Sequence, residues 1–232
     1  MNDPLGNALL EYHNTGEEQK LKVHSQDVHT DIYKASYFFR DFEEMPQLET
    51  KALKMCKGKV LDVGAGAGCH SIWLQQKGFE VTAIDTSPGA VEAMKQSGVL
   101  NAFCESIHDH KGEYDTILML MNGIGLAGNL QGVKVLLQKL KSLLKPGGQI
   151  LTDSSDIFHL YNNLEGDDLL NLDKDYLGEV SFQFEYKGIR SNWFDWIYLD
   201  QRTFGEIADS VGFNFEIVAT DSTKAYLAHL DI

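Results

Sequence analysis

The sequence predicts an α/β fold built on a doubly wound, mostly parallel β-sheet. From Lys59 onward, short apolar runs alternate with amphipathic helical patterns, as in consecutive βαβ units. A glycine-rich turn follows the first apolar run, and an acidic residue closes the second. The 232 residues are enough for one large domain of this class with a sizeable core, but not for two full domains.

The first two βα units have the clearest pattern. Residues 60–63 are typical of a buried strand, and the helix that follows stops at Gly78. The next strand ends at Asp85. Ser87 and Pro88 then supply the N-cap and the first residue of another helix.

Three further strands are expected at residues 100–104, 116–121 and 149–152. A helix over residues 131–144 precedes the last of them, because six apolar side chains form one stripe along it and lysines occupy the other faces. The sequence Pro-Gly-Gly at 146–148 then predicts a turn.

The alternation of strands and helices lapses after Ser155. Residues 180–186 alternate between apolar and polar side chains, which predicts an antiparallel β-hairpin that returns through residues 193–199. This hairpin is rich in aromatic side chains: Phe182, Phe184, Tyr186, Trp193, Phe194, Trp196 and Tyr198. They could stack on a flat ligand or form a contact between two subunits of a homodimer, and the sequence leaves both uses open.

The chain closes with a helix that stops at Gly212 and two strands, at 213–219 and 225–232. Residues 1–56 are less regular, with one helix expected from Pro46 to Met55.

The predicted organisation is an N-terminal helical segment, 1–56, that covers the site, and a Rossmann-like domain, 57–232. The β-hairpin is an insert in this domain, at about 156–200, after the fifth strand.

Composition excludes several classes of protein. The formal net charge of −14, without a local basic strip, disfavours nucleic acid as a partner. Cys56, Cys69 and Cys104 are odd in number and lack metal-like spacing, and the histidines also show no such spacing, so we expect no disulfide framework and no metal site. Neither a secretory signal nor a membrane span is evident, so a cytoplasmic location is expected.

Three features on neighbouring strand ends point to a nucleoside ligand. The turn at 64–68 contains three glycines, which let a ligand approach the backbone where free N–H groups of a helix N-terminus favour an anion. Asp85 could accept hydrogen bonds from both hydroxyls of a ribose, and Glu105 could accept from an adenine amino group. Each feature also has an ordinary explanation: a tight turn, a helix cap and a solvated surface acid.

Taken together, these motifs resemble those of the class I S-adenosylmethionine-dependent methyltransferases. Residues 60–68 (VLDVGAGAG) are similar to the first motif of that family, and Asp85 matches its ribose-binding acid. Glu105-Ser106 resembles the adenine-binding position. Residues 114–122 and 144–148 resemble the fourth-strand motif and the Lys-Pro-Gly-Gly turn, so the likeness covers roughly residues 57–155.

The resemblance implies a seven-stranded sheet whose last strand is antiparallel, and S-adenosylmethionine as the cofactor. It implies the following cofactor-binding residues in the core domain: Asp62, Gly64, Ala65, Gly66, Gly68, Asp85, Thr86, Glu105, Ser106, Leu120, Met121 and Asn122. Tyr37 and Arg40 are added because members of the family often fold an N-terminal segment over the cofactor, although the aromatic run at 37–39 could simply pack on the core. His159 could act as a base or be a solvated loop residue.

The function implied is methyl transfer to a small molecule, with a protein as the next choice of acceptor. No N-P-P-Y or D-P-P-Y sequence follows the fourth strand, which disfavours methylation of a nucleic-acid base. The alternatives are an NAD-dependent dehydrogenase, whose motif would place glycine where Cys69 stands, an aminopropyltransferase, and a non-catalytic S-adenosylmethionine binder. The accepting atom and any catalytic base stay open.

Overall fold

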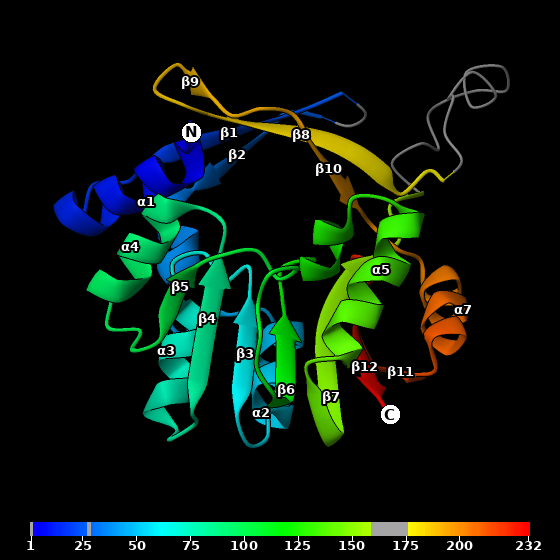
Figure 1. Ribbon diagram of the computed structural model, residues 1–232. Coiled ribbons are helices and arrows are strands. Elements are labelled where there is room, and N and C mark those ends of the chain that lie inside the picture. The colour runs from blue at the N-terminus through cyan, green and yellow to red at the C-terminus, as the bar shows by residue number, and fades with distance from the viewer. Residues whose placement is uncertain (1, 27–28, 159–175) are drawn as a thin grey trace, which may run out of the picture.

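The computed structural model describes residues 2–26, 29–158 and 176–232. Its centre is a seven-stranded sheet in the order β11-β12-β7-β6-β3-β4-β5, and a smaller antiparallel sheet lies across the upper edge of it (Figure 1). Within the described residues, no helix has the length and apolar character needed to cross a membrane.

The large sheet confirms the predicted α/β class. Five of its strands pair in parallel, while β12 is antiparallel to β7 and β11 is antiparallel to β12. All four residues of β3 are buried, as expected for a strand covered on both faces. The strands are β3 (Val60–Val63), β4 (Val81–Asp85), β5 (Ala102–Cys104), β6 (Tyr114–Met119), β7 (Leu144–Ser155), β11 (Asn214–Thr220) and β12 (Ala225–Asp231).

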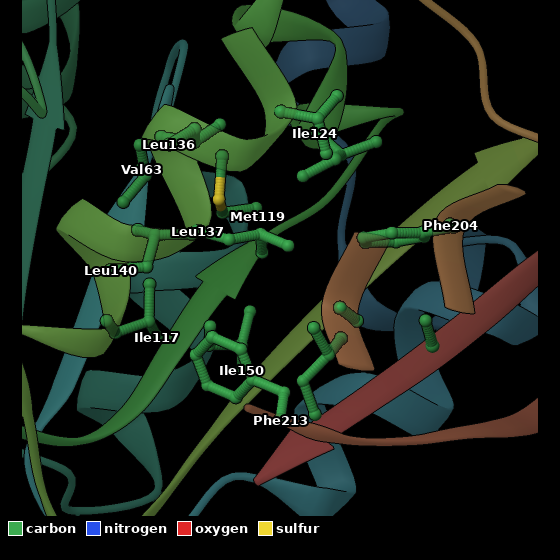
Figure 2. Packing of buried hydrophobic residues seen from close by; sticks show 14 of the residues in the cluster. Val63, Ile117, Met119, Ile124, Leu136, Leu137, Leu140, Ile150, Phe204 and Phe213 are labelled. Carbon is green, nitrogen blue, oxygen red and sulfur yellow. The ribbon is translucent and has the colours of Figure 1, made fainter. Parts of the chain in front are cut away.

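Helices cover both faces of this sheet because its strands alternate their side chains between two apolar cores. Ile117 and Met119 of β6 pack with helices α5 and α7, as Figure 2 shows, whereas Leu118 lies in a second core with α2 and α3. The α-helices are α1 (Pro4–Thr15), α2 (Gln47–Met55), α3 (Cys69–Gln76), α4 (Pro88–Gln96), α5 (Leu130–Lys141) and α7 (Gln201–Val211).

One predicted boundary was wrong, at the junction of α5 and β7. The helix ends at Lys141, and Leu144 already pairs with Tyr114 as the first residue of β7. The expected turn at 146–148 therefore lies inside a longer strand, where the register with β6 shifts and Gly147 has φ +74°. A bulge of this kind lets a strand keep its pairing through a Pro-Gly-Gly sequence.

The second, antiparallel sheet contains more strands than the predicted hairpin. Strand β8 pairs with β10, as expected, but also with β1 from the N-terminal segment, which in turn pairs with β2. This segment was expected to be helical, and its two strands were not predicted. The strands are β1 (Lys20–Ser25), β2 (Asp31–Lys34), β8 (Glu179–Tyr186), β9 (Ile189–Arg190) and β10 (Phe194–Ile197). No residue of β2 is buried, so its sequence carries little strand signal of its own.

Helix α1 attaches the N-terminus to the end of β4. Asp3 caps α1 by accepting from the N–H of Gly6, and it also accepts from the Ser87 hydroxyl and the Gly89 N–H at the start of α4. Gly6 and Gly89 lie so close that a Cβ on either would come within 2.6 Å of the other's backbone. This contact fixes the N-terminal residues beside the strand end that carries Asp85.

Candidate functional site

A cavity of about 750 Å³ lies between the smaller sheet and the carboxyl ends of β3, β4, β5 and β6. In Figure 1 the smaller sheet spans the tips of these strands, and α1 closes one side. We call the strand ends and their turns the floor, and the lining strands β1, β2, β8 and β10 the roof. The cavity thus occupies the place where open parallel sheets bind ligands.

The glycine turn after β3 forms part of the floor. Gly64 and Gly66 line the cavity, and their φ angles of +69° and +58° are in the left-handed region that favours glycine. The N–H groups of Gly64 and Ala65 donate to the Ile84 carbonyl, and that of Gly66 donates to Asp85. These three N–H groups are therefore not the free anion donors expected from the sequence. This part of the turn instead lets a ligand come close to the backbone, because its glycines have no side chains.

Gly68 has a different role from the rest of the turn. It does not line the cavity, and its N–H donates to the Ala65 carbonyl. Its φ is +85°, and a Cβ there would come within 2.7 Å of Val99. Gly68 therefore permits the packing of α3 against its neighbours.

Asp85 is both a cap and a cavity residue, which unites the two roles considered from the sequence. One of its oxygens accepts from Gly66 N at 2.9 Å and the other from Ser87 N at 2.9 Å. Removal from water, opposed in part by these bonds and reinforced by the nearby Asp3 carboxylate, raises the pKa of Asp85 to about 6. A carboxylate in this setting gains from further donors, and the two hydroxyls of a ribose would supply them.

Glu105 lines the cavity at the end of β5 and is held by a buried histidine. His110 Nδ1 lies 2.7 Å from a Glu105 carboxylate oxygen, and His110 Nε2 lies 2.8 Å from the Tyr114 hydroxyl. Sequence reasoning considered His110 only as a metal ligand and missed this contact. Thr86 and Ser106 also line the cavity, so the expected adenosine-binding residues come together on one side of it.

The floor under β6 carries two strained residues. Met121 and Asn122 have φ angles of +62° and +57°, in the left-handed region that is uncommon for residues other than glycine and asparagine. The N–H of Asn122 donates to both oxygens of Asp153 at 3.0 Å, which holds this turn in place. Burial raises the pKa of Asp153 to about 7. Sequence reasoning did not single out Asp153.

Leu120 and Met121 line the cavity as expected, but Asn122 does not. The Asn122 side chain is buried, donates to the Ile197 carbonyl and accepts from the Ser154 hydroxyl. It therefore joins the floor to β10 instead of facing a ligand.

Tyr37 and Arg40 lie behind the floor and do not line the cavity. The Arg40 guanidinium lies 4.0 Å from the Tyr37 ring centroid and is bonded to Glu49, while its Nε is buried and has no partner among the described residues. Glu49 also bonds His70 at 2.7 Å, and His70 does line the cavity.

The contacts in this cluster shift the pKa values of Glu49 and His70 toward their charged forms. Burial alone would raise the pKa of Glu49, but the hydrogen bond and charge of His70 and the charge of Arg40 lower it. Burial likewise opposes a charged His70, yet Cys69, Glu49 and Asp62 raise its pKa well above the usual value. Neither Glu49 nor His70 was singled out from the sequence.

The roof is lined by the aromatic hairpin. All of the aromatic residues predicted there line the cavity except Tyr186, which packs with Ala8 and Leu21. Tyr33 and Val23, from the N-terminal strands, join them. The candidate base His159 lies outside the described residues.

The charged residues around the cavity are mainly acidic. Four carboxylates of the floor and wall line it: Asp3, Asp62, Asp85 and Glu105. In the described part of the chain, no lysine or arginine lines it, and no group of three His, Cys, Asp or Glu side chains could hold a metal ion. A site with this charge suits a ligand with a positive centre and hydroxyl donors, as the sulfonium and ribose of S-adenosylmethionine provide.

Comparisons with known proteins identify the family of the chain. Residues 35–217 match the family described as a methyltransferase domain. The crystal structure of a SAM-dependent methyltransferase from Bacteroides fragilis in complex with S-adenosyl-L-homocysteine is 40% identical, with a TM-score of 0.92, and the match covers 100% of this chain and 95% of that one.

Curated relatives are more distant. The putative methyltransferase YqeM of Bacillus subtilis is 26% identical over 198 residues, which cover 72% of this chain and 78% of the relative. The 23S rRNA (uracil(747)-C(5))-methyltransferase of Pyrococcus horikoshii is 28% identical over 124 residues. This match covers 50% of the chain but only 29% of that relative, so it concerns a shared part and not the whole protein.

Proposed function

We propose a small-molecule acceptor for this chain, which belongs to the methyltransferase domain family and is an S-adenosylmethionine-dependent methyltransferase. The observation that carries the proposal is the enclosure of the cavity by the roof and α1. Its volume of about 750 Å³ has to hold the cofactor and the acceptor together. It lies within the usual range for small-molecule sites, about 300–1,000 Å³.

The assignment of residues to the cofactor is part of the proposal. Asp85 would accept from the ribose hydroxyls, Glu105, oriented by His110, would face the adenosine, and the turn at 64–66 would lie against the methionyl part. Asp62, Thr86, Ser106, Leu120 and Met121 complete the contact as cavity-lining residues. Gly68, Asn122, Tyr37 and Arg40 act from behind, by holding the turns that make contact.

When bound, the cofactor supplies an activated methyl group, so the chain's residues mainly have to align the acceptor and exclude water. Alignment alone can contribute roughly 7–11 kcal/mol to the barrier in favourable cases. The floor fixes one partner through hydrogen bonds, and the aromatic roof covers the other. We also propose that residues 1–56 serve as the cover of the site, because α1, β1 and β2 each contribute lining residues.

Charge supports a small acceptor over RNA. The chain has a formal net charge of −14, which opposes the approach of a polyanion to the mouth of the cavity. The name of the Pyrococcus horikoshii relative refers to rRNA, so RNA is a direct alternative to test.

The test offers the purified protein methyl-labelled S-adenosylmethionine and three separate acceptor pools. These are a metabolite extract freed of macromolecules, total RNA, and protein from the same cells. We expect label in the metabolite pool, and none with Asp85→Ala. Label that appears only in RNA or protein would disprove the small-molecule acceptor.

A further inference from the structure

The surface left for the acceptor is the inner face of the roof, and it is formed by aromatic rings. The cross-strand pairs Val23 with Phe184 and Phe182 with Phe194 place these side chains on one face of the sheet. The Phe194 ring centroid lies 4.9 Å from that of Phe184 and 6.2 Å from that of Trp196. An acceptor between floor and roof therefore meets a continuous aromatic surface.

The positive charges of the roof are on its other face. Lys22 and Arg190 both pair with Glu185, at 3.3 Å and 2.7 Å, and Lys22 alternates with the buried, inward Leu21 and Val23. Asp195, a further acidic residue of the cavity lining, accepts from the hydroxyl of Ser181, its cross-strand partner. No lysine or arginine of the described residues is thus available to the acceptor from the roof.

The floor adds negative charge to the same space. Asp62, Asp85 and Glu105 line it, and the cavity-lining His70, whose pKa is raised, is paired with Glu49. Glu105 is bonded to His110 and Asp62 accepts from the Ser71 hydroxyl, but among the described residues no lysine or arginine lines the cavity beside these carboxylates. An anionic acceptor would therefore lose its hydration without gaining a positive partner, which is costly.

We propose that the acceptor is an amine carried on a flat, apolar frame. This inference rests on the proposed small-molecule function and specifies its substrate class. The aromatic roof binds the frame and attracts an ammonium group through cation–π interactions. Phenolate, thiolate and carboxylate acceptors are disfavoured, because each brings a negative charge next to the floor carboxylates.

The transfer step is balanced without a further reactant. The ammonium form of the acceptor first gives one proton to solvent, which frees the nitrogen lone pair. This pair forms a bond to the methyl carbon, and the carbon–sulfur bond breaks with its electrons returning to sulfur. The positive charge moves from sulfur to nitrogen, so the charge inside the cavity is the same before and after transfer.

The experiment compares acceptors that differ only in their reactive group. Tryptamine, tryptophol and indole-3-propionate share one frame and carry an amine, an alcohol and a carboxylate, and phenyl and naphthyl sets extend the comparison. Binding to enzyme saturated with S-adenosyl-L-homocysteine is measured by calorimetry, and methyl transfer by mass spectrometry. We expect the amines to bind at least about tenfold more tightly than the carboxylates, with methylation on nitrogen.

The results separate this inference from the proposed function. The amine proposal would be disproved by tighter binding of alcohols or carboxylates, by methylation on oxygen, or by no binding of any amine. The small-molecule function would still stand in each case if the earlier assay labels a small metabolite. Label confined to RNA or protein in that assay would remove both.

Variants of the roof provide a second readout. Phe184→Leu keeps an apolar side chain but removes a ring, so it should raise KM for the amine several-fold with little change in kcat, and Phe184→Tyr should restore it. The matched control is Phe103→Leu, on β5, a half-exposed phenylalanine that does not line the cavity. Equal effects of Phe184→Leu on matched amines and alcohols would contradict the cation–π contact.

Discussion

The floor of the cavity consists of the ends of parallel strands, whereas its roof is an antiparallel sheet laid across those ends (Figure 1). The floor offers carboxylates that are fixed by short-range hydrogen bonds, such as Asp85 to Gly66 and Ser87. The roof offers aromatic rings that are fixed by pairing of distant strands, such as Val23 with Phe184. On the proposed assignment, the floor would bind the polar cofactor through hydrogen bonds, and the roof would line an apolar space for the acceptor.

The largest effect is expected from removing the Asp85 carboxylate from the floor. Asp85→Ala should weaken binding of S-adenosyl-L-homocysteine roughly 10- to 100-fold, since hydrogen bonds to a charged group are each worth about 1.5–3 kcal/mol. Calorimetry measures the change, with Asp209→Ala on the exposed face of α7 as control. Binding within about twofold of the wild type would mean that the floor does not hold the ribose.

A substitution that displaces the roof should weaken acceptor binding and leave cofactor binding unchanged. Gly125, in the short helix η3 (Gly123–Ala127), lies under Trp196, and a Cβ there would come within 2.1 Å of the Trp196 ring nitrogen. Gly125→Ala should displace the roof at a cost of about 1–3 kcal/mol in stability and raise KM for the acceptor. The dissociation constant of the cofactor should stay near the wild-type value. A selective loss of cofactor affinity would show that the floor and the roof are not independent.

The pH dependence of cofactor binding sharpens the role of the floor. Burial raises the pKa of Asp85 to about 6, and on the proposed assignment the ionised carboxylate would accept from both ribose hydroxyls. Affinity should therefore fall as the pH drops below about 6, by up to about tenfold per pH unit. Titration calorimetry over about pH 5 to 8 checks this. A dependence retained by Asp85→Asn would assign it to another group.

The free energy of unfolding of the ligand-free protein should fall as the pH rises, whereas cofactor affinity should rise. Asp85 and Asp153 have pKa values raised to about 6 and about 7, above the value near 3.9 of an unfolded aspartate. The folded state holds their protons longer, so these residues lower the free energy of unfolding as the pH rises from about 4 to 7. Asp153→Asn should flatten this slope in denaturant unfolding. An unchanged slope would show that groups other than Asp153 cause the pH dependence of stability.

The smallest effect is expected from Tyr114, which would act on the cofactor only through His110 and Glu105. Tyr114→Phe removes one hydroxyl from His110, which orients Glu105, and Tyr114 itself does not line the cavity. The loss of one hydrogen bond, about 0.5–1.5 kcal/mol, should weaken cofactor binding by roughly two- to tenfold at most. Transfer to the acceptor at saturating cofactor should be unaffected, and a lowered kcat there would argue against a positioning role.

Much of the floor could be predicted from the sequence because its elements are local. The strand at 60–63, the glycine turn and Asp85 lie within one βαβ unit, and the cap by Ser87 was found as expected. The boundary between α5 and β7 was wrong because the leucine stripe continues past the last helical residue. Nothing local marks Leu144 as a strand residue, since its pairing partner is Tyr114.

The sequence by itself determined the parallel sheet and the glycine turn and Asp85 of the cavity floor, because their spacing, apolar periodicity and glycine positions act over a few residues. Only the tertiary structure decided the roof, where β1 pairs with β8 about 160 residues away, and the buried contacts of Glu49, His70 and Asp153. Strands such as β2, with four exposed residues, gain their structure from a partner and not from their own side chains. Pairing between distant strands depends on backbone hydrogen bonds that every sequence can make, so it leaves little trace in the sequence.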